Sequence, residues 1–546
     1  MGVRGRVVFP QYARGRDGVE IEEGTTLWDH ASRLGIQISS ACGGRGECGK
    51  CVVRVDRGSE SLAERTQAEQ SFPLAEEERL ACQARVISGD RDIHLFVKAA
   101  GEYTILTESI EGRVSLDPFI SRRGDWVFFR DIREHPLGRY EGELLGLAID
   151  VGTTTLVAQI LDVERGEVIA TLACKNPQAA YGDDVISRIG YADQHQDGLV
   201  RLQRAVVEAV NSMLRDFEES KGRDLREHIY EAVVVGNSTM RNLFFGLSVH
   251  SLGTSPYEPE DRSPLSERAE KLALQIHPEA NVYGVPLVAG QVGADCLGVI
   301  LACDLYRGLR PCMAVDIGTN GEVAVGNRDR ILAASNAAGG AFEGGTAGCG
   351  VGAIMGAIKN VWIKDSRASY ETIGGRPPLG ICGSGLIDLL AGMLKERIIG
   401  ENGRLSEPYR EANEFIITRD GGKIGLTQKD INELRLAKAG SALNQQTLMR
   451  KYGLDLEELD RIYLAGGFGN YVNLDSAMAI GILPNRREKL VKIGNGALTG
   501  ARQILLSRGR REDAERIAPQ IEHVKLSEEE DFLDRYIKEL YLRRWP

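Results

Sequence analysis

Short apolar runs that end in glycine, threonine or aspartate recur along this chain. The run from Leu144 to Ile149 ends at Asp150, and a second apolar run follows a turn made of Gly152, Thr153, Thr154 and Thr155. Because apolar runs of this length bounded by turn residues are typical of buried strands, the pattern predicts a strand, a tight turn and a second strand. The same pattern returns from Ala314 to Glu322, where Asp316 precedes Gly318, Thr319, Asn320 and Gly321.

Two further apolar runs also end in small or polar residues. Val285–Ala289 leads into a loop that ends at Asp295, and Ile462–Ala465 leads into Gly466, Gly467, Phe468 and Gly469. Residues at such strand ends bind the ligand in an open α/β sheet, although capping of helices is an alternative role. Amphipathic segments from Leu199 to Phe217 and from Thr427 to Leu448 predict two long helices.

The two Asp-x-Gly-Thr turns have the composition of an anion site. Glycine allows backbone N–H groups to approach an anion closely, and threonine hydroxyls add further donors. Asp150, at the end of a strand, is placed to hold a metal ion through water. Either hairpin alone could be an ordinary turn, but Asp150 and Asp316 lie 166 residues apart in matching contexts. We therefore expect a duplicated unit whose two halves face one ligand.

Four cysteines near the N-terminus have a spacing that fits an iron–sulfur cluster. Cys42, Cys48 and Cys51 follow the pattern C-x5-C-x2-C, and Cys82 follows after 30 intervening residues. Three thiolates on a glycine-rich loop and one distant thiolate suit a [2Fe–2S] cluster, and the loop N–H groups can reach its sulfurs. Zinc is less favoured because zinc sites use two paired C-x2-C knuckles, and purely structural thiols are the remaining alternative.

Composition and charge narrow the class of protein. The chain has 546 residues, with 42% hydrophobic and 27% charged residues, as in ordinary globular proteins. A net charge of −11 argues against nucleic acid or an anionic membrane as the main partner. No apolar run approaches 18 residues, and the N-terminus lacks a signal-peptide core, so we expect a cytoplasmic protein. Six further cysteines stand among apolar or small neighbours and are expected to be buried thiols rather than a second cluster.

The three glycine-rich loops together resemble those of the superfamily that contains actin, sugar kinases and heat-shock chaperones. In that superfamily the two Asp-x-Gly-Thr hairpins are the first and second phosphate loops, and the loop Gly466–Gly469 binds adenosine. The resemblance implies that the hairpins bind the phosphates of ATP. It also implies that Asp150 and Asp316 hold Mg²⁺ and that Asp295 joins them as a catalytic residue.

The N-terminal unit resembles a β-grasp [2Fe–2S] ferredoxin, with the C-x5-C spacing of adrenodoxin-like members. A ferredoxin unit ahead of this ATPase resembles the reductive activators of corrinoid proteins, and the shared motifs extend over nearly the whole chain. Members can carry an additional small domain between the two units. Only about 45 residues intervene here, so that domain is short or missing.

The expected fold is therefore α/β and multi-domain: a β-grasp ferredoxin followed by a duplicated, actin-like (ribonuclease-H-like) ATPase. The expected units are a ferredoxin domain, a linker or short connecting module, a first and a second ATPase subdomain, and a C-terminal segment that completes the ATPase, at 1–97, 98–142, 143–310, 311–472 and 473–546.

The family resemblance implies an ATP-dependent transfer of one electron from the cluster to Co(II) of a corrinoid protein, which restores the Co(I) needed for methyl transfer. The expected partners are that corrinoid protein and an upstream electron donor, and a homodimer is among the assemblies left open. Two other functions remain open. One is a different ATP-driven reductase activator, such as those that feed electrons to acyl-CoA dehydratases. The other is a redox-sensing, nucleotide-binding regulator or scaffold without turnover.

Overall fold

The computed structural model describes most of the chain, in segments that include nearly all of the ATPase region. The described residues are 5–10, 18–34, 36, 38, 44–46, 51–72, 74–97, 114–130, 134–318, 320–336, 340–342, 347–420, 422–466 and 471–545. Cys42 and Cys48 of the cysteine motif lie outside them. So do Thr319 of the second hairpin and Gly467, Phe468 and Gly469 of the third loop.

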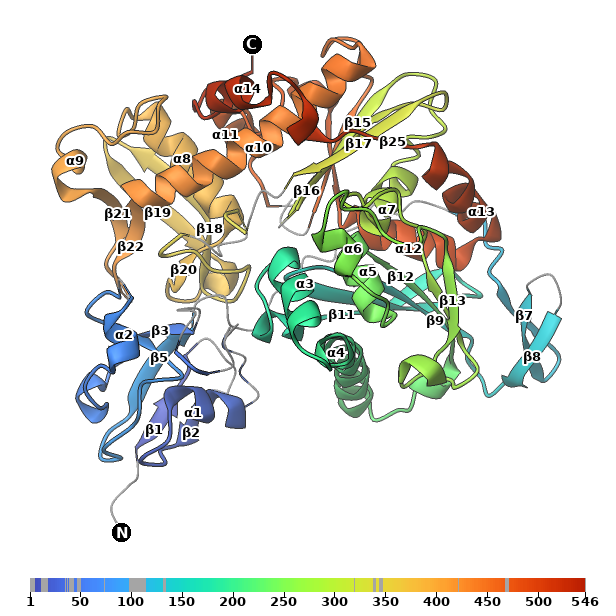
Figure 1. Ribbon diagram of the computed structural model, residues 1–546, viewed down its shortest axis with the longest axis horizontal. Coiled ribbons are helices and arrows are strands. Elements are labelled where there is room, and N and C mark those ends of the chain that lie inside the picture. Colours follow the sequence, from blue (N-terminus) through green and yellow to red (C-terminus); the bar gives the residue numbers. More distant parts are fainter. Residues whose placement is uncertain are drawn as a thin grey trace.

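The N-terminal unit is a five-stranded mixed sheet with a helix against it, as expected of a β-grasp ferredoxin (Figure 1). Its strand order is β2 (Gly18–Glu20), β1 (Arg6–Val8), β5 (Ile93–Val97), β3 (Val52–Arg57), β4 (Glu78–Leu80), and its helices are α1 (Leu27–Arg33) and α2 (Gln67–Gln70). Thr26 begins α1 in a capping box with Asp29, which satisfies the free N–H groups of the first turn. Val7, Leu27 and Leu95 belong to a hydrophobic core that this unit has to itself.

A three-stranded antiparallel sheet connects the ferredoxin unit to the ATPase. It consists of β6 (Ile120–Arg123), β7 (Trp126–Arg130) and β8 (Glu134–Arg139). Ile120 and Val127 are buried in a core that they share with the ATPase. The guanidinium of Arg511 stacks on the ring of Phe119 at 4.0 Å. This part of the connection is therefore packed against the ATPase.

The two halves of the ATPase are built on matching sheets. In the first half the order is β11 (Glu167–Lys175), β10 (Thr155–Asp162), β9 (Leu145–Val151), β12 (Ile229–Gly236), β14 (Asn281–Gly284), β13 (Leu265–Arg268). In the second it is β24 (Leu490–Gly494), β23 (Ile462–Ala465), β15 (Cys312–Ile317), β16 (Gly321–Gly326), β17 (Ile331–Asn336), β25 (Glu522–His523). Each half has three antiparallel strands from its hairpin and two parallel strands on the other side, which confirms the expected duplication.

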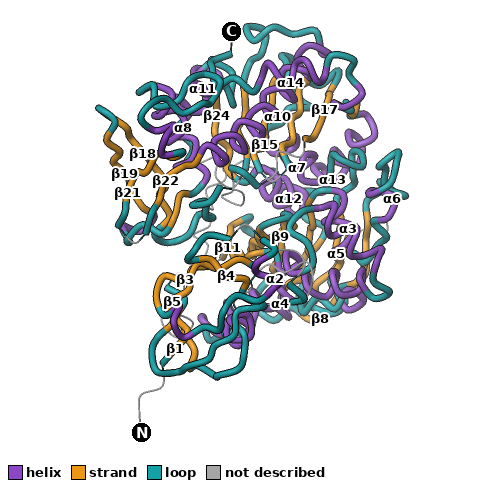
Figure 2. Tube along the Cα trace, turned by 60° about the vertical axis from the view of Figure 1, so that its left-hand side comes forward, coloured by secondary structure: helices purple, strands orange, loops and turns teal. Residues whose placement is uncertain are grey.

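Helices cover these sheets, and a small lobe extends from the second half (Figures 1 and 2). The helices of the first half are α3 (Val185–Gln194), α4 (Gly198–Lys221), α5 (Ser238–Phe244), α6 (His250–Gly253) and α7 (Ala294–Ala302). Those of the second half are α8 (Gly383–Lys395), α9 (Tyr409–Ala412), α10 (Gln428–Tyr452), α11 (Leu474–Ile480), α12 (Gly496–Leu506), α13 (Arg508–Ile517) and α14 (Phe532–Glu539). The lobe carries β18 (Ala357–Lys364), β19 (Arg367–Thr372), β20 (Gly380–Ile381), β21 (Glu414–Thr418) and β22 (Ile424–Thr427). The two long helices expected from amphipathic segments are α4 and α10.

The two halves meet where α7 crosses α12. A Cβ on Gly298 would lie 2.8 Å from the carbonyl oxygen of Ala497, and a Cβ on Gly500 would fall within contact distance of the backbone of Gly298. Glycine at both positions lets the helices approach closely. Arg511 of α13 also pairs with the buried Glu231 of β12 at 2.6 Å. The C-terminal part of the chain thus packs on the first half as well as the second.

The ferredoxin unit lies below the lobe of β18–β22 in both views (Figures 1 and 2). Phe96 of β5, which is 4% exposed, is buried in a small apolar cluster with Val351, Ile354, Ile373 and Cys382 of the second half. The guanidinium of Arg54 lies over the ring of Phe96, with Cζ 4.7 Å from the ring centre. Within the described residues, no helix has the length and apolarity that crossing a membrane requires.

Candidate functional site

The first hairpin joins β9 to β10 through a turn that requires glycine. The N–H of Gly152 donates to the carbonyl of Thr155 at 3.1 Å. A Cβ at residue 152 would lie 2.5 Å from that same oxygen. Asp150 lies at the end of β9, and Thr153, Thr154 and Thr155 complete the turn. The strand–turn–strand expected from the sequence is confirmed.

Three buried polar side chains donate hydrogen bonds to this turn. Asn176 donates from Nδ2 to the carbonyl of Gly152 at 2.8 Å, and Arg188 donates from Nη2 to the carbonyl of Thr153 at 2.6 Å. Asn237 donates from Nδ2 to Oγ1 of Thr153 at 3.0 Å. Arg188 is fully buried, and burial lowers the pKa of its guanidinium to about 10. Nothing in the sequence singles out Arg188 for this role.

Four carboxyl groups gather where the two halves face each other. The charge of Asp150 acts on Asp295, and the charges of Asp295 and Asp316 act on Glu322. Burial raises the pKa of Asp150 to about 6 and that of Asp295 to about 7, and the charge of Asp150 adds to the effect on Asp295. Burial, followed by the charges of its acidic neighbours, raises the pKa of Glu322. The structure thus brings together the three acids expected from the sequence and adds Glu322, which stands in the second hairpin motif.

The four carboxyl groups would together carry an excess of negative charge, which a bound cation could balance. Asn495 donates from Nδ2 to Oδ2 of Asp150 at 2.8 Å, and the backbone N–H of Cys296 donates to Oδ1 of Asp295 at 2.8 Å. Carboxylates this close repel one another unless a proton or a metal ion compensates them. Within the described segments, no three carboxylate, imidazole or thiol groups form a ready-made metal site. A metal ion here would accordingly be held through water or nucleotide phosphates, as is common for Mg²⁺.

The second hairpin and the third loop border the same acids. Gly318, Asn320 and Gly321 are described, and Asn444 of α10 donates from Nδ2 to the carbonyl of Gly321 at 2.9 Å. Gly466 has φ +109°, and a Cβ there would lie 2.8 Å from Oδ1 of Asp316. This conformation and this proximity both require glycine. The two loops therefore begin side by side.

The described part of the cysteine motif fits an iron–sulfur cluster. Cys51 and Cys82 face each other with their sulfurs 3.2 Å apart, at neighbouring positions beside the paired strands β3 and β4. Gly44 and Gly46 have φ of +90° and +77°, and a Cβ on Gly44 would lie 2.5 Å from the ring of Trp28. The contact with Cys51 and three N–H donors, from Gln83, Gly46 and Cys82 itself, lower the pKa of Cys82 to about 6, which favours the thiolate that iron requires.

Five of the six remaining described cysteines show the behaviour of buried thiols, and Cys349 is half-buried. Burial raises the pKa of Cys174 and Cys303 to about 12, and it also raises the pKa of Cys296, Cys312 and Cys382. Thiols with raised pKa values are poor nucleophiles and poor metal ligands at neutral pH.

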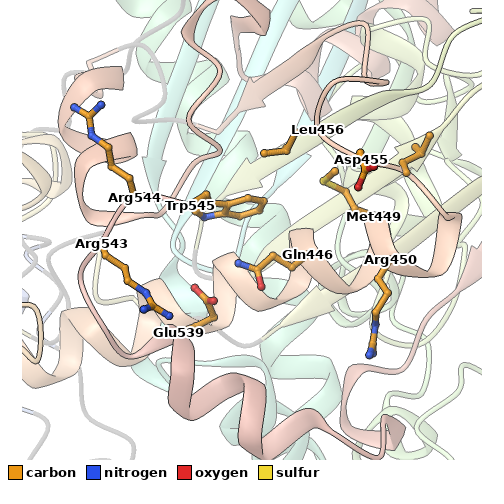
Figure 3. A pocket seen from close by; sticks show the side chains of 10 residues that line it. Gln446, Met449, Arg450, Asp455, Leu456, Glu539, Arg543, Arg544 and Trp545 are labelled. Atoms are coloured by element: carbon orange, nitrogen blue, oxygen red, sulfur yellow. The ribbon is translucent and has the colours of Figure 1, made fainter.

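A separate hollow of about 390 Å³ lies between α10 and the C-terminal segment (Figure 3). Trp545 and Met449 form its apolar wall, and Arg450, Glu539 and Arg543 add charge. None of the phosphate-loop residues lines it. The hollow is thus distinct from the acid cluster between the halves.

Comparison with known families divides the chain into three matched segments. Residues 14–86 match the 2Fe-2S iron-sulfur cluster binding domain. Residues 145–308 match the RACo middle region, and residues 310–545 match the C-terminal domain of RACo, the ASKHA domain.

Several known proteins are similar to this chain over most of its length. The corrinoid activation enzyme RamQ of Eubacterium limosum is 30% identical, with 97% of this chain and 98% of that protein aligned. The [Co(II) methylated amine-specific corrinoid protein] reductase of Methanosarcina barkeri is 27% identical over 73% of this chain and 77% of its own length. A solved reductive activator for corrinoid, iron-sulfur protein has a TM-score of 0.73 and 30% identity, and the alignment covers 99% of this chain and 98% of the solved one. The order of the sites along the chain and this full-length similarity show that the protein belongs to the family of reductive activators of corrinoid proteins.

Proposed function

We propose that this protein uses ATP to drive the transfer of one electron to the Co(II) form of a corrinoid protein. Co(II) gains the electron and becomes Co(I), and an upstream reductant supplies the electron to the ferredoxin unit. The observation that carries the proposal is the presence, on one chain, of the paired thiols Cys51 and Cys82 and of a two-hairpin nucleotide site.

A [2Fe–2S] cluster supplies one-electron chemistry when it is bound. Cys51 and Cys82 would hold it together with Cys42 and Cys48, which lie outside the described residues. Gly44 and Gly46 leave room for backbone N–H groups to approach the sulfurs. The ferredoxin unit has its own core, so these thiols keep their positions independently of the ATPase.

The nucleotide would bind between the two halves. The hairpins whose turns contain Gly152 and Gly318 would bind the phosphates through their backbone N–H groups. The loop from Gly466 to Gly469 would contact adenosine. Asp150, Asp316 and Asp295 would hold Mg²⁺ through water, with Glu322 beside them. Asn176, Arg188 and Asn237 keep the first hairpin in its shape.

ATP is needed because the electron transfer is energetically uphill for a ferredoxin-type donor. Each 59 mV of shortfall lowers a one-electron equilibrium about tenfold. A ligand can shift a conformational equilibrium only by its differential affinity for the two states. A nucleotide that touches Asp150 in one half and Asp316 in the other would favour their closed arrangement, and α7 and α12 lie between the sheets that would move.

The test is to mix this protein with a purified Co(II) corrinoid protein, a reductant and ATP, and to follow the absorbance of Co(I). Formation of Co(I) that requires ATP and this protein supports the proposal. ATP binding without any Co(I), with several corrinoid proteins, would instead favour a regulator that binds nucleotide without transferring electrons.

A further inference from the structure

The residue that follows the last cluster cysteine has an unusual position. Gln83 turns its side chain back toward the cysteine loop. Its Nε2 donates to the carbonyl of Gly44 at 3.1 Å and lies 3.5 Å from Sγ of Cys82. The two N–H bonds of one amide group thus reach both the loop backbone and a ligand sulfur.

The surrounding structure fixes this amide in place. A Cβ on Gly46 would lie 2.9 Å from both Cδ and Nε2 of Gln83, so the side chain rests directly on the loop backbone. The same imaginary Cβ would lie 3.0 Å from Ala68 of the segment that contains α2. Gln83 is half-buried, so the rest of the unit shields part of its side chain from water. The backbone N–H of Gly46 donates to the sulfur of Cys82 as well.

Donors aimed at a ligand sulfur act on the redox equilibrium. Reduction adds one electron to a centre whose thiolate ligands are already negative. Hydrogen bonds to the sulfurs stabilise the reduced, more negative form more than the oxidised form, and they raise the reduction potential. Because a hydrogen bond to a charged group is stronger than one to a neutral group, loss of one such bond is expected to change the equilibrium constant for reduction about tenfold.

We propose that Gln83 sets the reduction potential of the cluster by donating to Sγ of Cys82 while its second N–H holds the carbonyl of Gly44. Gln83 is a positioning residue, because it acts through a ligand. Its role rests on the [2Fe–2S] site included in the proposed function. A higher potential makes the unit easier to reduce by its upstream donor and leaves a larger shortfall for ATP to overcome.

The experiment is a redox titration of the anaerobically purified full-length protein, followed by visible absorbance and by the paramagnetic signal of the reduced cluster. Gln83→Leu keeps the size of the side chain but removes both donors. Its equilibrium constant for reduction is expected to fall about tenfold, which corresponds to about 59 mV for one electron. Gln83→Glu places a carboxylate without an N–H against the sulfur, so it should lower the potential further.

Gln70→Leu is the matched control. Gln70 lies in the same unit and is exposed, and its side chain donates to the carbonyl of Arg65. Its loss should leave the potential unchanged. The proposal is supported if the potential falls in the order wild type, Gln83→Leu, Gln83→Glu, with two irons retained in each.

Two results would overturn the proposal, and they are distinguishable. An unchanged potential in both Gln83 variants with intact clusters would show that the hydrogen bond has no redox role, while the cluster assignment stands. A wild-type protein that holds zinc or no metal after anaerobic purification would overturn the cluster assignment itself, and the role of Gln83 with it. If Gln83→Leu fails to fold, the comparison of Gln83→Glu with wild type still decides, because that variant keeps the length and shape of the side chain.

Discussion

At the scale of single residues, the carboxylates between the two halves give the most direct test of the nucleotide site. Asp150→Asn or Asp316→Asn keeps the shape of the side chain but removes a charge that the proposed Mg²⁺ would need. We expect ATP turnover to fall at least about a hundredfold, since metal-assisted charge stabilisation contributes several kcal/mol. The visible spectrum of the cluster should stay unchanged, because its cysteines belong to a separate core.

Asp365→Asn is the control for these two variants. Asp365 lies in the exposed turn between β18 and β19, at φ +50°, a conformation that asparagine adopts readily. Turnover by this variant should equal that of the wild type. Wild-type turnover in both Asp150→Asn and Asp316→Asn would show that the phosphate loops are elsewhere.

The raised pKa of Asp295 predicts a pH dependence of stability. Its folded-state pKa is about 7, against an ordinary value of 3.8, so between these values the folded protein binds the extra proton. The stability that this proton contributes is complete below pH 3.8 and is lost as the pH rises through 7. From pH 6 to 8, wild-type protein without nucleotide should therefore lose about 1 kcal/mol more stability than Asp295→Asn.

Urea unfolding of both proteins at pH 6 and 8 measures this difference. Saturating Mg²⁺ and ADP should reduce it, because a bound cation keeps the carboxylates ionised in the folded state. An equal pH response of both proteins without nucleotide would mean that Asp295 is ionised throughout this range.

At the scale of elements, the close crossing of α7 and α12 depends on two glycines. Gly500→Ala would place a methyl group against the backbone of Gly298, which cannot move away as a side chain can. Overpacking of this kind costs about 1–3 kcal/mol. Because the crossing lies between the two sheets, the variant should also weaken nucleotide binding.

Gly190→Ala is expected to have the opposite effect on stability. Gly190 lies within α3, and a Cβ there would meet only Nε2 of Gln194, at 3.9 Å. Alanine at this open helical position should stabilise the protein by about 0.5–1 kcal/mol. Thermal unfolding of both variants measures the two effects. A Gly500→Ala variant as stable as Gly190→Ala would mean that the two helices are not in contact.

Elements with a local signal could be predicted from the sequence. The hairpins at Asp150 and Asp316 combine an apolar run with turn residues, and α4 and α10 are long and amphipathic, so their positions follow from short-range patterns. The pairing of Arg511 with Glu231 could not be predicted, because it joins residues 280 positions apart. Arg188 was missed for a related reason: an arginine in a polar helix is usually exposed, and only the fold places it behind Thr153. The packing of the connecting module on the ATPase could not be predicted either, since the burial of Ile120 and Val127 depends on a core built by distant helices.

At the scale of the whole molecule, the contact of Phe96 with the second half shows how the ferredoxin unit is carried. Phe96 comes from the strand β5, and its ring is buried among Val351, Ile354 and Ile373 rather than in the core of its own unit. The unit is therefore both tethered to the ATPase and docked on it. Docking at one place suits a resting position, while the delivery of an electron to a partner protein also requires approach of the cluster to the corrinoid.

Separated halves can distinguish the tether from the docking contact. The chain should be divided before residue 114, because β6 and β7 share a core with the ATPase. We expect the ferredoxin piece to accept an electron and the ATPase piece to bind ATP and the corrinoid protein. Mixed at micromolar concentration, they should restore Co(I) about a hundredfold more slowly than the whole chain, because a short tether supplies an effective concentration near millimolar. Equal rates for mixed and intact protein would show that the tether is dispensable.

The docking contact predicts a second difference between these preparations. Removal of a buried aromatic ring costs about 3 kcal/mol, so Phe96→Ala should weaken association of the two separated pieces more than a hundredfold. In the intact chain the same substitution should slow Co(I) formation far less, since the tether keeps the unit nearby after the contact is lost. Titration calorimetry of the pieces and Co(I) absorbance of the intact variant measure these two effects. If Phe96→Ala slows the intact protein as much as it weakens the separated pieces, the docked arrangement is itself the one that delivers the electron, and the ferredoxin unit does not need to leave the lobe.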